Sequence, residues 1–407
     1  MQVLIALVLL VISVRPALAG PILSMEDAEK LLLENNIELK VKKTELKKSD
    51  AEVAGARLLP NPEARYFLAT EGGGSNDRES TYSFIQPVDI TGKRNKRIDM
   101  AEKRRDSGRL FFDHETLVAL SQMKQLYFRL LTLKENRKAM EEIIGMAEEV
   151  ERKTASRVEA GDASEAELMK LGAEKKRFLR GLENLRTDMR VERKKLAYLL
   201  SLPDTDFELE DKLQYPIPSN VRELAEKALD RRTDIKAQAF AVDAAAASLA
   251  LAKREVLPNV GIEAGYRRWV GGHDGFVFGL VIPLPIFDRN QGKIAAAYAE
   301  TEKQRLSYEL LKRYAAKEIG LLQDKIAYYQ VRVSDMAGQI ETTKELTMIS
   351  RTAYEEGAAS LIELLDAVRA EKDLIMEYNN TRYEYWATVF ELERATNSRL
   401  NAAGGKR

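Results

Sequence analysis

Two carboxylates three residues apart, Glu363 and Asp366, are the clearest candidates in this chain for electrostatic chemistry. On a helix this spacing places both side chains on one face, one turn apart. Ser360 precedes Glu363 by three positions, the spacing of a capping box, so helix capping explains that glutamate equally well. No cap requires Asp366, which leaves it available to attract cations where copies of the chain bring such side chains together.

The same arrangement occurs earlier in the chain, where Ser164 is followed by Glu167 and where Lys170 occupies the position that matches the second carboxylate. A glycine precedes each serine by three positions, Gly161 in the first case and Gly357 in the second. Glycine suits the left-handed residue that ends a helix, and serine suits the residue that begins the next one. Both segments therefore predict a tight turn between two helices.

Catalytic and metal-binding residues are scarce. The chain has no cysteine and only two histidines, His114 and His273, which excludes disulfides, thiolate metal sites and a cysteine nucleophile. No nucleophile is paired with a base, and no phosphate-binding loop or metal-ligand spacing occurs. With 64 basic and 64 acidic residues the net charge is zero, so there is no basic footprint for nucleic acid. We expect no catalytic residues, no bound metal and no cofactor.

The two predicted turns belong to an internal repeat with an offset of about 198 residues. Leu59-Pro60-Asn61 returns as Leu257-Pro258-Asn259, and Gly92-Lys93 returns as Gly292-Lys293. The duplication predicts a first repeat over 20–201, a linker over 202–220, a second repeat over 221–399 and a flexible tail over 400–407. Residues 1–19 read as a signal peptide, because an apolar stretch precedes the small-residue site Ala17-Leu18-Ala19.

Each repeat contains a long stretch without proline, which predicts a long helix up to residue 160 in the first repeat and 356 in the second, each followed by a returning helix. The apolar residues of these stretches follow a narrow stripe with alternating spacings of three and four. In the second repeat the stripe consists of Ile319, Leu322, Ile326, Tyr329, Val333, Met336 and Ile340. The pattern fits the wall of a hollow coiled coil and a closed helical bundle equally well.

The proline-rich windows predict a β-hairpin in each repeat, about 62–90 and about 259–285. Phe276, Phe278, Leu280 and Ile282 alternate at period two, which predicts one continuously apolar and aromatic face. The lengths approach those of transmembrane strands. Four strands cannot close a barrel, and lipid does not tolerate open edges, so other copies must complete the sheet. Three copies would supply 12 strands, although this reasoning leaves two or four copies open.

The order and duplication of several segments resemble the TolC family of outer-membrane efflux channels. These segments are LLPNPE at 58–63, QPVDITGKRNKR at 86–97, LPNV at 257–260, IPLPIFDRNQGKIAAA at 282–297 and YEEGAASLIELLDA at 354–367. The resemblance implies a mainly α-helical fold with a membrane β-barrel, in which a homotrimer forms a 12-stranded barrel and a helical tunnel. It also implies the outer membrane of a Gram-negative bacterium, with a periplasmic adaptor, an inner-membrane pump and outer-membrane lipid as partners.

What the resemblance implies for individual residues is a periplasmic constriction lined by Glu363 and Asp366, with Tyr354, Glu167 and Lys170 in closing contacts. The helix-end turns Gly161, Ser164, Gly357 and Ser360 would meet the adaptor. The junction between barrel and tunnel would include Pro87, Gly92, Pro283, Pro285 and Gly292. The segments after the hairpins most resemble the heavy-metal and cation efflux branch.

A basic run begins where the first hairpin gives way to helix, and it either contacts lipid phosphates or forms an ordinary solvated surface. It comprises Lys93, Arg94, Lys96, Arg97, Lys103, Arg104 and Arg105. Trp269 is a candidate for an interfacial aromatic girdle or for ordinary packing. Alternative functions are a periplasmic coiled-coil adaptor or structural protein and a type I protein secretion duct. An enzyme is the least supported alternative.

Overall fold

The computed structural model describes residues 22–70, 78–203, 205–210, 228–269 and 272–398. The predicted signal peptide, the first glycine-rich turn at 71–77, most of the linker and the tail lie outside these residues. The chain divides into two compact units, each with segments from both repeats. We call residues 1–36, 122–216 and 328–387 the turn unit, because both helix turns lie in it. Residues 37–121, 217–327 and 388–407 are the sheet unit.

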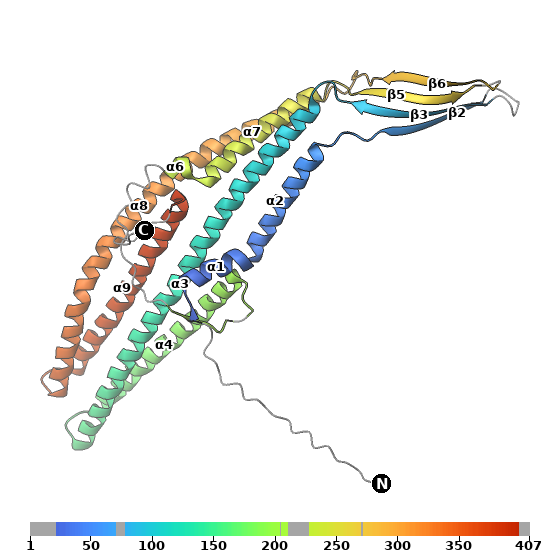
Figure 1. Ribbon diagram of the computed structural model, residues 1–407. Helices are drawn as coiled ribbons and strands as arrows, with labels where there is room; N and C mark the ends of the chain where they lie inside the picture. Colours follow the sequence, from blue (N-terminus) through green and yellow to red (C-terminus); the bar gives the residue numbers. More distant parts are fainter. Residues whose placement is uncertain (1–21, 71–77, 204, 211–227, 270–271, 399–407) are drawn as a thin grey trace, which may run out of the picture. The chain divides into compact units, whose positions relative to one another are not determined.

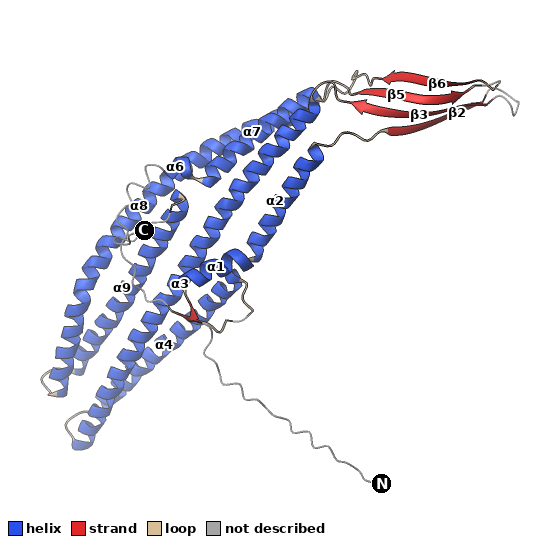
Figure 2. Cartoon of the chain, in the orientation of Figure 1, coloured by secondary structure: helices blue, strands red, loops and turns tan. Residues whose placement is uncertain are grey.

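Long helices dominate both repeats (Figures 1 and 2). The prediction of two proline-free helices is confirmed, since α3 has 68 residues and α8 has 65. The helices are α1 (Met25–Asn35), α2 (Ile37–Ala56), α3 (Lys93–Ala160), α4 (Glu165–Leu200), α6 (Ala228–Arg231), α7 (Thr233–Arg254), α8 (Gln291–Glu355) and α9 (Leu361–Thr396).

The long helices end and restart as their sequences predict. Gly161 and Gly357 adopt φ values of +83° and +76°, the left-handed region that favours glycine. The Ser164 hydroxyl accepts a hydrogen bond from the Glu167 N–H, and the Ser360 hydroxyl accepts one from the Glu363 N–H, each at 3.3 Å. Both predicted N-caps are thus confirmed.

In the turn unit, α3, α4, α8 and α9 pack around one apolar core. Its buried members are Met140, Ile143, Ile144, Val150, Leu171, Phe178, Leu182, Tyr354, Leu361, Leu364 and Val368. Two short strands, β1 (Ile22–Leu23) and β4 (Glu208–Leu209), pair in parallel in the same unit. Apolar residues of both long helices are thus buried in a core that they share with the two returning helices.

Four strands of the sheet unit form one antiparallel sheet in the order β2-β3-β5-β6 (Figure 2). They are β2 (Glu63–Thr70), β3 (Arg78–Val88), β5 (Val260–Arg268) and β6 (Asp274–Val281). Both predicted hairpins are present, and β3 pairs with β5 to join them, with Tyr82 opposite Tyr266. One side of β2 and one side of β6 remain as the two edges of the sheet.

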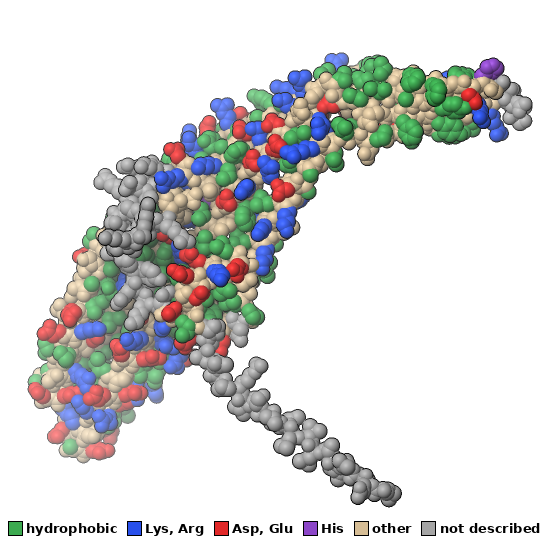
Figure 3. Space-filling view, in the orientation of Figure 1, with side chains coloured by type: hydrophobic (Ala, Val, Ile, Leu, Met, Phe, Trp, Pro, Cys, Tyr) green, Lys and Arg blue, Asp and Glu red, His purple; other side chains and the backbone are tan. Residues whose placement is uncertain are grey.

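The two faces of this sheet differ in chemistry. Phe276, Phe278 and Leu280 are 79%, 79% and 69% exposed, so the predicted apolar face points outward, and hydrophobic side chains gather over the sheet in Figure 3. On the opposite face Ser83 and Ile85 are buried at 2% and 4%. A sheet that curves toward this second face crowds its side chains in this way. We call the first face the outer face and the second the inner face.

Glycine permits the curvature on the inner face. A Cβ atom at Gly265 would lie 2.5 Å from the Tyr82 carbonyl oxygen and 2.6 Å from the Ser83 Cβ, distances that real Cβ atoms essentially never show. A Cβ at Gly275 would lie 2.6 Å from the Trp269 ring. Trp269 therefore packs against its own hairpin, which favours packing over an aromatic girdle for this residue.

The hairpins end earlier than the predicted bounds of about 90 and about 285, since β3 ends at Val88 and β6 ends at Val281. Pro283 lacks a backbone N–H and cannot continue the ladder. After β3, Asp89 turns to the start of α3, where its carboxylate accepts hydrogen bonds from the N–H groups of Thr91 at 3.0 Å and Arg94 at 2.6 Å. Burial raises the pKa of Asp89, but these bonds outweigh it and lower the pKa to about 2.

Among the described residues, α7 is long and apolar enough by composition to span a membrane. Its apolar character comes mainly from alanine, and it packs in the sheet unit with Ala237, Ala244 and Ala247 buried. A packing helix meets the same criteria, so α7 carries no argument for a membrane span.

Candidate functional site

The two predicted constriction carboxylates lie on the first turns of α9 and are both exposed. Asp366 is not isolated, because its Oδ1 lies 3.3 Å from Nη1 of Arg369, one turn further along the helix. Lys170 is exposed near the start of α4. A pairing of Lys170 with Asp366 between neighbouring helix turns, which their matching positions in the two repeats suggest, stays a prediction.

Arg369 connects this carboxylate to α4. Its Nε and Nη2 donate to the two carboxylate oxygens of Glu174 at 2.9 and 2.7 Å, a bidentate pair. The hydrogen bonds from Arg369 lower the pKa of Glu174 and outweigh its burial, which acts in the opposite direction. The guanidinium of Arg369 thus shares its charge between a buried structural partner and an exposed carboxylate at the predicted constriction.

Tyr354 lies at the end of α8 and is 4% exposed. Its hydroxyl is 3.0 Å from the Thr154 hydroxyl and 3.4 Å from Oε2 of Glu167, so the predicted proximity of Tyr354 and Glu167 is present within one chain. Arg157 donates to the Tyr354 carbonyl at 3.0 Å, and its guanidinium carbon lies 5.5 Å from the centre of the tyrosine ring. Burial raises the pKa of Tyr354, so its hydroxyl stays protonated and can donate.

Charged pairs also join α3 to α8 just before the turns. Lys153 contacts Glu355 at 2.8 Å, and Arg351 contacts Glu149 at 2.6 Å and Glu355 at 3.0 Å. Hydrogen bonds from Arg351 and Lys153 lower the pKa of Glu149, and the bond from Lys153 is the main cause of the lowered pKa of Glu355. This network connects the first repeat to the second.

Sequence reasoning missed three residues of this region, Arg157, Glu174 and Arg369. The i,i+3 spacing from Asp366 to Arg369 was the available signal for one of them. Arg157 and Glu174 act across helices that are distant in sequence, and nothing local marks them. Arg157 also occupies space near the second turn, since its Nη2 would lie 3.7 Å from a Cβ at Gly357.

The inner face of the sheet carries paired charges. Glu263 accepts a hydrogen bond from Ser83 at 2.6 Å and lies 3.8 Å from the Arg65 guanidinium. Arg267 contacts Glu79 at 3.1 Å and donates to the Thr81 hydroxyl at 2.9 Å. Charged side chains on one face and exposed aromatic side chains on the other are the pattern of a membrane strand between water and lipid.

The predicted junction residues cluster where this sheet meets the helices. Pro87 lies in β3 opposite Gly261, Gly92 has a φ of +75° just before α3, and Gly292 lies in the first turn of α8. Pro283 and Pro285 line a common cavity after β6. The structure therefore brings together residues from both repeats that the sequence predicted as one region.

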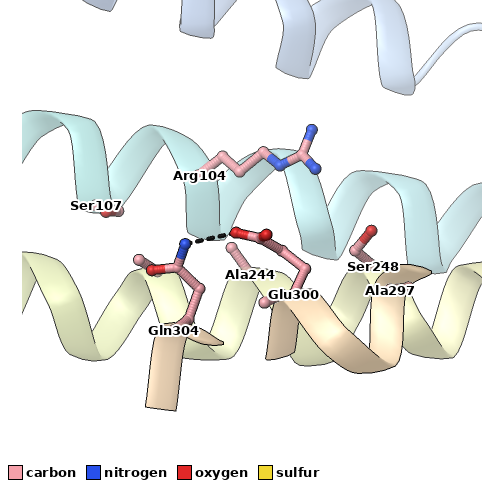
Figure 4. A pocket seen from close by; sticks show the side chains of 9 residues that line it. Arg104, Ser107, Ala244, Ser248, Ala297, Glu300 and Gln304 are labelled. Atoms are coloured by element: carbon pink, nitrogen blue, oxygen red, sulfur yellow. Dashed lines mark hydrogen bonds between the residues drawn. The ribbon is translucent and has the colours of Figure 1, made fainter. Parts of the chain in front are cut away.

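A second cavity, of about 220 Å³, lies further along the helices of the sheet unit, between α3, α7 and α8 (Figure 4). It is lined largely by Ala and Ser. The side-chain amide of Gln304 donates a hydrogen bond to Glu300 at 2.6 Å, and its oxygen accepts one from the amide of Gln238 at 2.7 Å. Within the described residues no group of three or more His, Asp or Glu side chains is arranged to hold a metal ion.

The protein-family model described as "Outer membrane efflux protein" matches residues 30–197 and 224–398 of this chain. The two matched segments correspond to the two repeats. Together they cover most of the chain.

Among curated proteins, the chain is 26% identical over 363 residues to the cobalt-zinc-cadmium resistance protein CzcC of Cupriavidus metallidurans, covering 86% of this chain and 84% of that protein. It is 24% identical to the nickel-cobalt-cadmium resistance protein NccC of Alcaligenes xylosoxydans xylosoxydans, covering 69% of this chain and 66% of that protein.

Among solved structures, the outer membrane protein VceC of Vibrio cholerae has a TM-score of 0.80 at 18% identity, covering 93% of this chain and 97% of that one. CusC has a TM-score of 0.76 at 17% identity, covering 92% of each chain. These similarities concern the fold.

Proposed function

Because the chain belongs to the outer membrane efflux protein family, we propose that three copies of it form the outer-membrane exit duct of a tripartite efflux system. The four-stranded sheets of the copies together make a 12-stranded barrel, and the long helices make the periplasmic tunnel. A periplasmic adaptor and an inner-membrane pump complete the path. The duct is passive, and its partners supply the energy.

The two-faced sheet with unpaired edges is the observation that carries this proposal. Lipid offers no hydrogen-bond partners, and each unpaired backbone group costs several kcal/mol there. Pairing β6 of one copy with β2 of the next satisfies both edges and leaves the aromatic face toward lipid and the charged face toward water. A coiled-coil adaptor would account for the helices but not for this sheet.

In the turn unit, Glu363 and Asp366 of three copies form a ring of six carboxylates that acts as the periplasmic constriction. The contacts of Tyr354 with Glu167 and of Arg369 with Glu174 hold each pair of helices in the narrow state. Lys170 of a neighbouring copy pairs with Asp366. The turns at Gly161, Ser164, Gly357 and Ser360 dock to the adaptor, which opens the ring by separating these contacts.

Divalent metal cations are the proposed cargo. The names of CzcC and NccC refer to resistance to cobalt, cadmium, zinc and nickel, and a carboxylate ring concentrates such cations at the entrance. The duct does not select them by tight coordination. Passage requires binding that is favourable enough to enter and weak enough to leave.

Conductance in planar bilayers tests the constriction. Replacing both carboxylates in the Glu363→Gln/Asp366→Asn variant should raise the resting conductance, because the closing pair of Lys170 with Asp366 is lost. It should also weaken block by cobalt ions at least about tenfold, because six negative charges leave the ring. A matched variant, Glu341→Gln/Glu345→Gln, removes the same charge from exposed positions of α8 and should behave as the wild type. Unchanged conductance and unchanged block in the first variant would disprove the assignment.

A further inference from the structure

A polar cavity of about 590 Å³ lies in the sheet unit where the strands meet the helices. Both repeats contribute to it. Lys93 and Arg97 come from the first turns of α3, and Lys293 comes from the first turn of α8. Apolar residues complete the wall, namely Leu251, Val256, Pro258, Pro283, Leu284 and Pro285.

The three cations of this cavity outnumber the acids that line it. Two acids, Glu255 and Asp288, line the same cavity and keep their charge while they accept hydrogen bonds from the neutral Asn290, so the three cations exceed them by one positive charge. The Asn290 amide donates to Glu255 at 3.3 Å, and its backbone N–H donates to Asp288 at 2.8 Å. Among the described residues, none of the three cations is in an ion pair. Lys93 instead donates to the amide oxygen of Asn259 at 2.9 Å. The balance of charge in the cavity is positive and favours an anion.

The apolar outer face of the sheet leads directly into this cavity. Phe278, Leu280, Ile282 and Leu284 follow one another at period two, and they are 79%, 69%, 49% and 73% exposed. The last of them lines the cavity. Ile286 and Phe287 follow and are 60% and 92% exposed. The exposed apolar side chains that begin on the outer face of β6 thus continue to the cavity that contains the three cations.

We propose that this cavity binds the phosphate headgroup of a phospholipid, with the acyl chains lying along the outer face of β6. The ligand must be anionic at one end and apolar at the other, which an inorganic anion or a soluble peptide does not satisfy. The site would anchor the duct in the inner leaflet of the outer membrane. This inference rests on membrane insertion and not on efflux activity.

Native mass spectrometry of the full-length protein, delipidated and then titrated with phosphatidylglycerol in detergent, tests the site. Removing two of the cations in Arg97→Gln/Lys293→Gln should weaken lipid binding about thirtyfold, since each basic residue near a headgroup strengthens binding about fivefold. The control Arg313→Gln/Lys325→Gln removes two exposed charges from α8 away from the cavity and should bind as the wild type.

Three results would overturn the proposal. The first is equal lipid binding by the cavity variant and the wild type. The second is displacement of the lipid by millimolar inorganic phosphate alone, which would identify a free anion as the ligand. The third is loss of binding in both variants, which would identify a diffuse charge effect. Single-channel conductance of the same preparations distinguishes failure of lipid binding from failure of the channel itself. If the double variant does not assemble, the single variant Lys293→Gln replaces it.

Discussion

Replacing Gly265 with alanine should abolish most assembly of the duct in the membrane. The added Cβ would overlap the Tyr82 carbonyl and the Ser83 side chain, so β5 must move away from β3 and the sheet must flatten. Overpacking of this kind costs about 1–3 kcal/mol at each site. Since a trimer contains three such sites, its formation should fall by at least about a hundredfold.

The fraction of heat-resistant oligomer on unboiled gels measures this effect. Gly338→Ala is the matched control, because a Cβ there meets nothing within 4 Å and alanine stabilises a helix interior by about 0.5–1 kcal/mol. A Gly265→Ala protein that assembles as well as the control would show that sheet curvature is not required for assembly.

Replacing Arg232 with methionine should destabilise the sheet unit by about 3–5 kcal/mol, the usual consequence of leaving a buried charge without its partner. Arg232 is 4% exposed and donates to Asp234 at 2.7 Å and to Glu318 at 2.6 Å. Arg394 also contacts Glu318, so the network joins the start of α7 to α8 and the end of α9. Thermal unfolding in detergent checks the prediction, with the exposed Arg313→Met as control.

The pH dependence of stability gives a second measure of this variant. In the native protein burial raises the pKa of Asp234 and of Glu318, but Arg232 outweighs it and both lie below their ordinary values of 3.8 and 4.5. The two carboxylates therefore contribute their full stabilisation above their ordinary pKa values. This stabilisation is lost as the pH falls through the lower pKa values that they have in the folded protein.

Without Arg232, burial should raise the pKa of Asp234, so the variant should become more stable as the pH falls from neutrality. Burial lowers the pKa of the nearby His114, which makes the folded state less stable as the pH falls below the ordinary value of 6.5, so the effect of Asp234 is measured as the difference in pH dependence between the variant and the wild type. A variant whose stability falls with acidification as the wild type's does would contradict the assigned role of Arg232.

The parts of the fold that sequence predicted are those fixed by local chemistry. Gly161 and Ser164 specify a turn through their own backbone conformation and hydroxyl, and the alternation from Phe276 to Leu280 specifies a face through its period. Pro283 marked the end of a strand, although the end came two residues earlier than the proline itself.

The parts that sequence did not predict depend on residues distant along the chain. Arg232 reaches Glu318 across 86 residues, and Arg369 reaches Glu174 across 195. Charges occur throughout these helices, so no spacing distinguishes the partners that meet from those that remain solvated. The constriction, the docking turns and the boundaries between the repeats and the linker remain predictions.

Cross-linking between copies tests the central claim, a barrel closed by three chains, most directly. The chain has no cysteine, so a pair introduced at Phe67 in β2 and Val277 in β6 is unique in it. Both positions lie on the inner face. Variants with the first cysteine at Arg65 or Ala69 instead of Phe67 test other registers of β2 against β6, because a disulfide forms only where the two positions lie opposite each other. We predict a covalent ladder in membranes that ends at three chains. No cross-link in any register, or a ladder that ends at another number, would contradict the account.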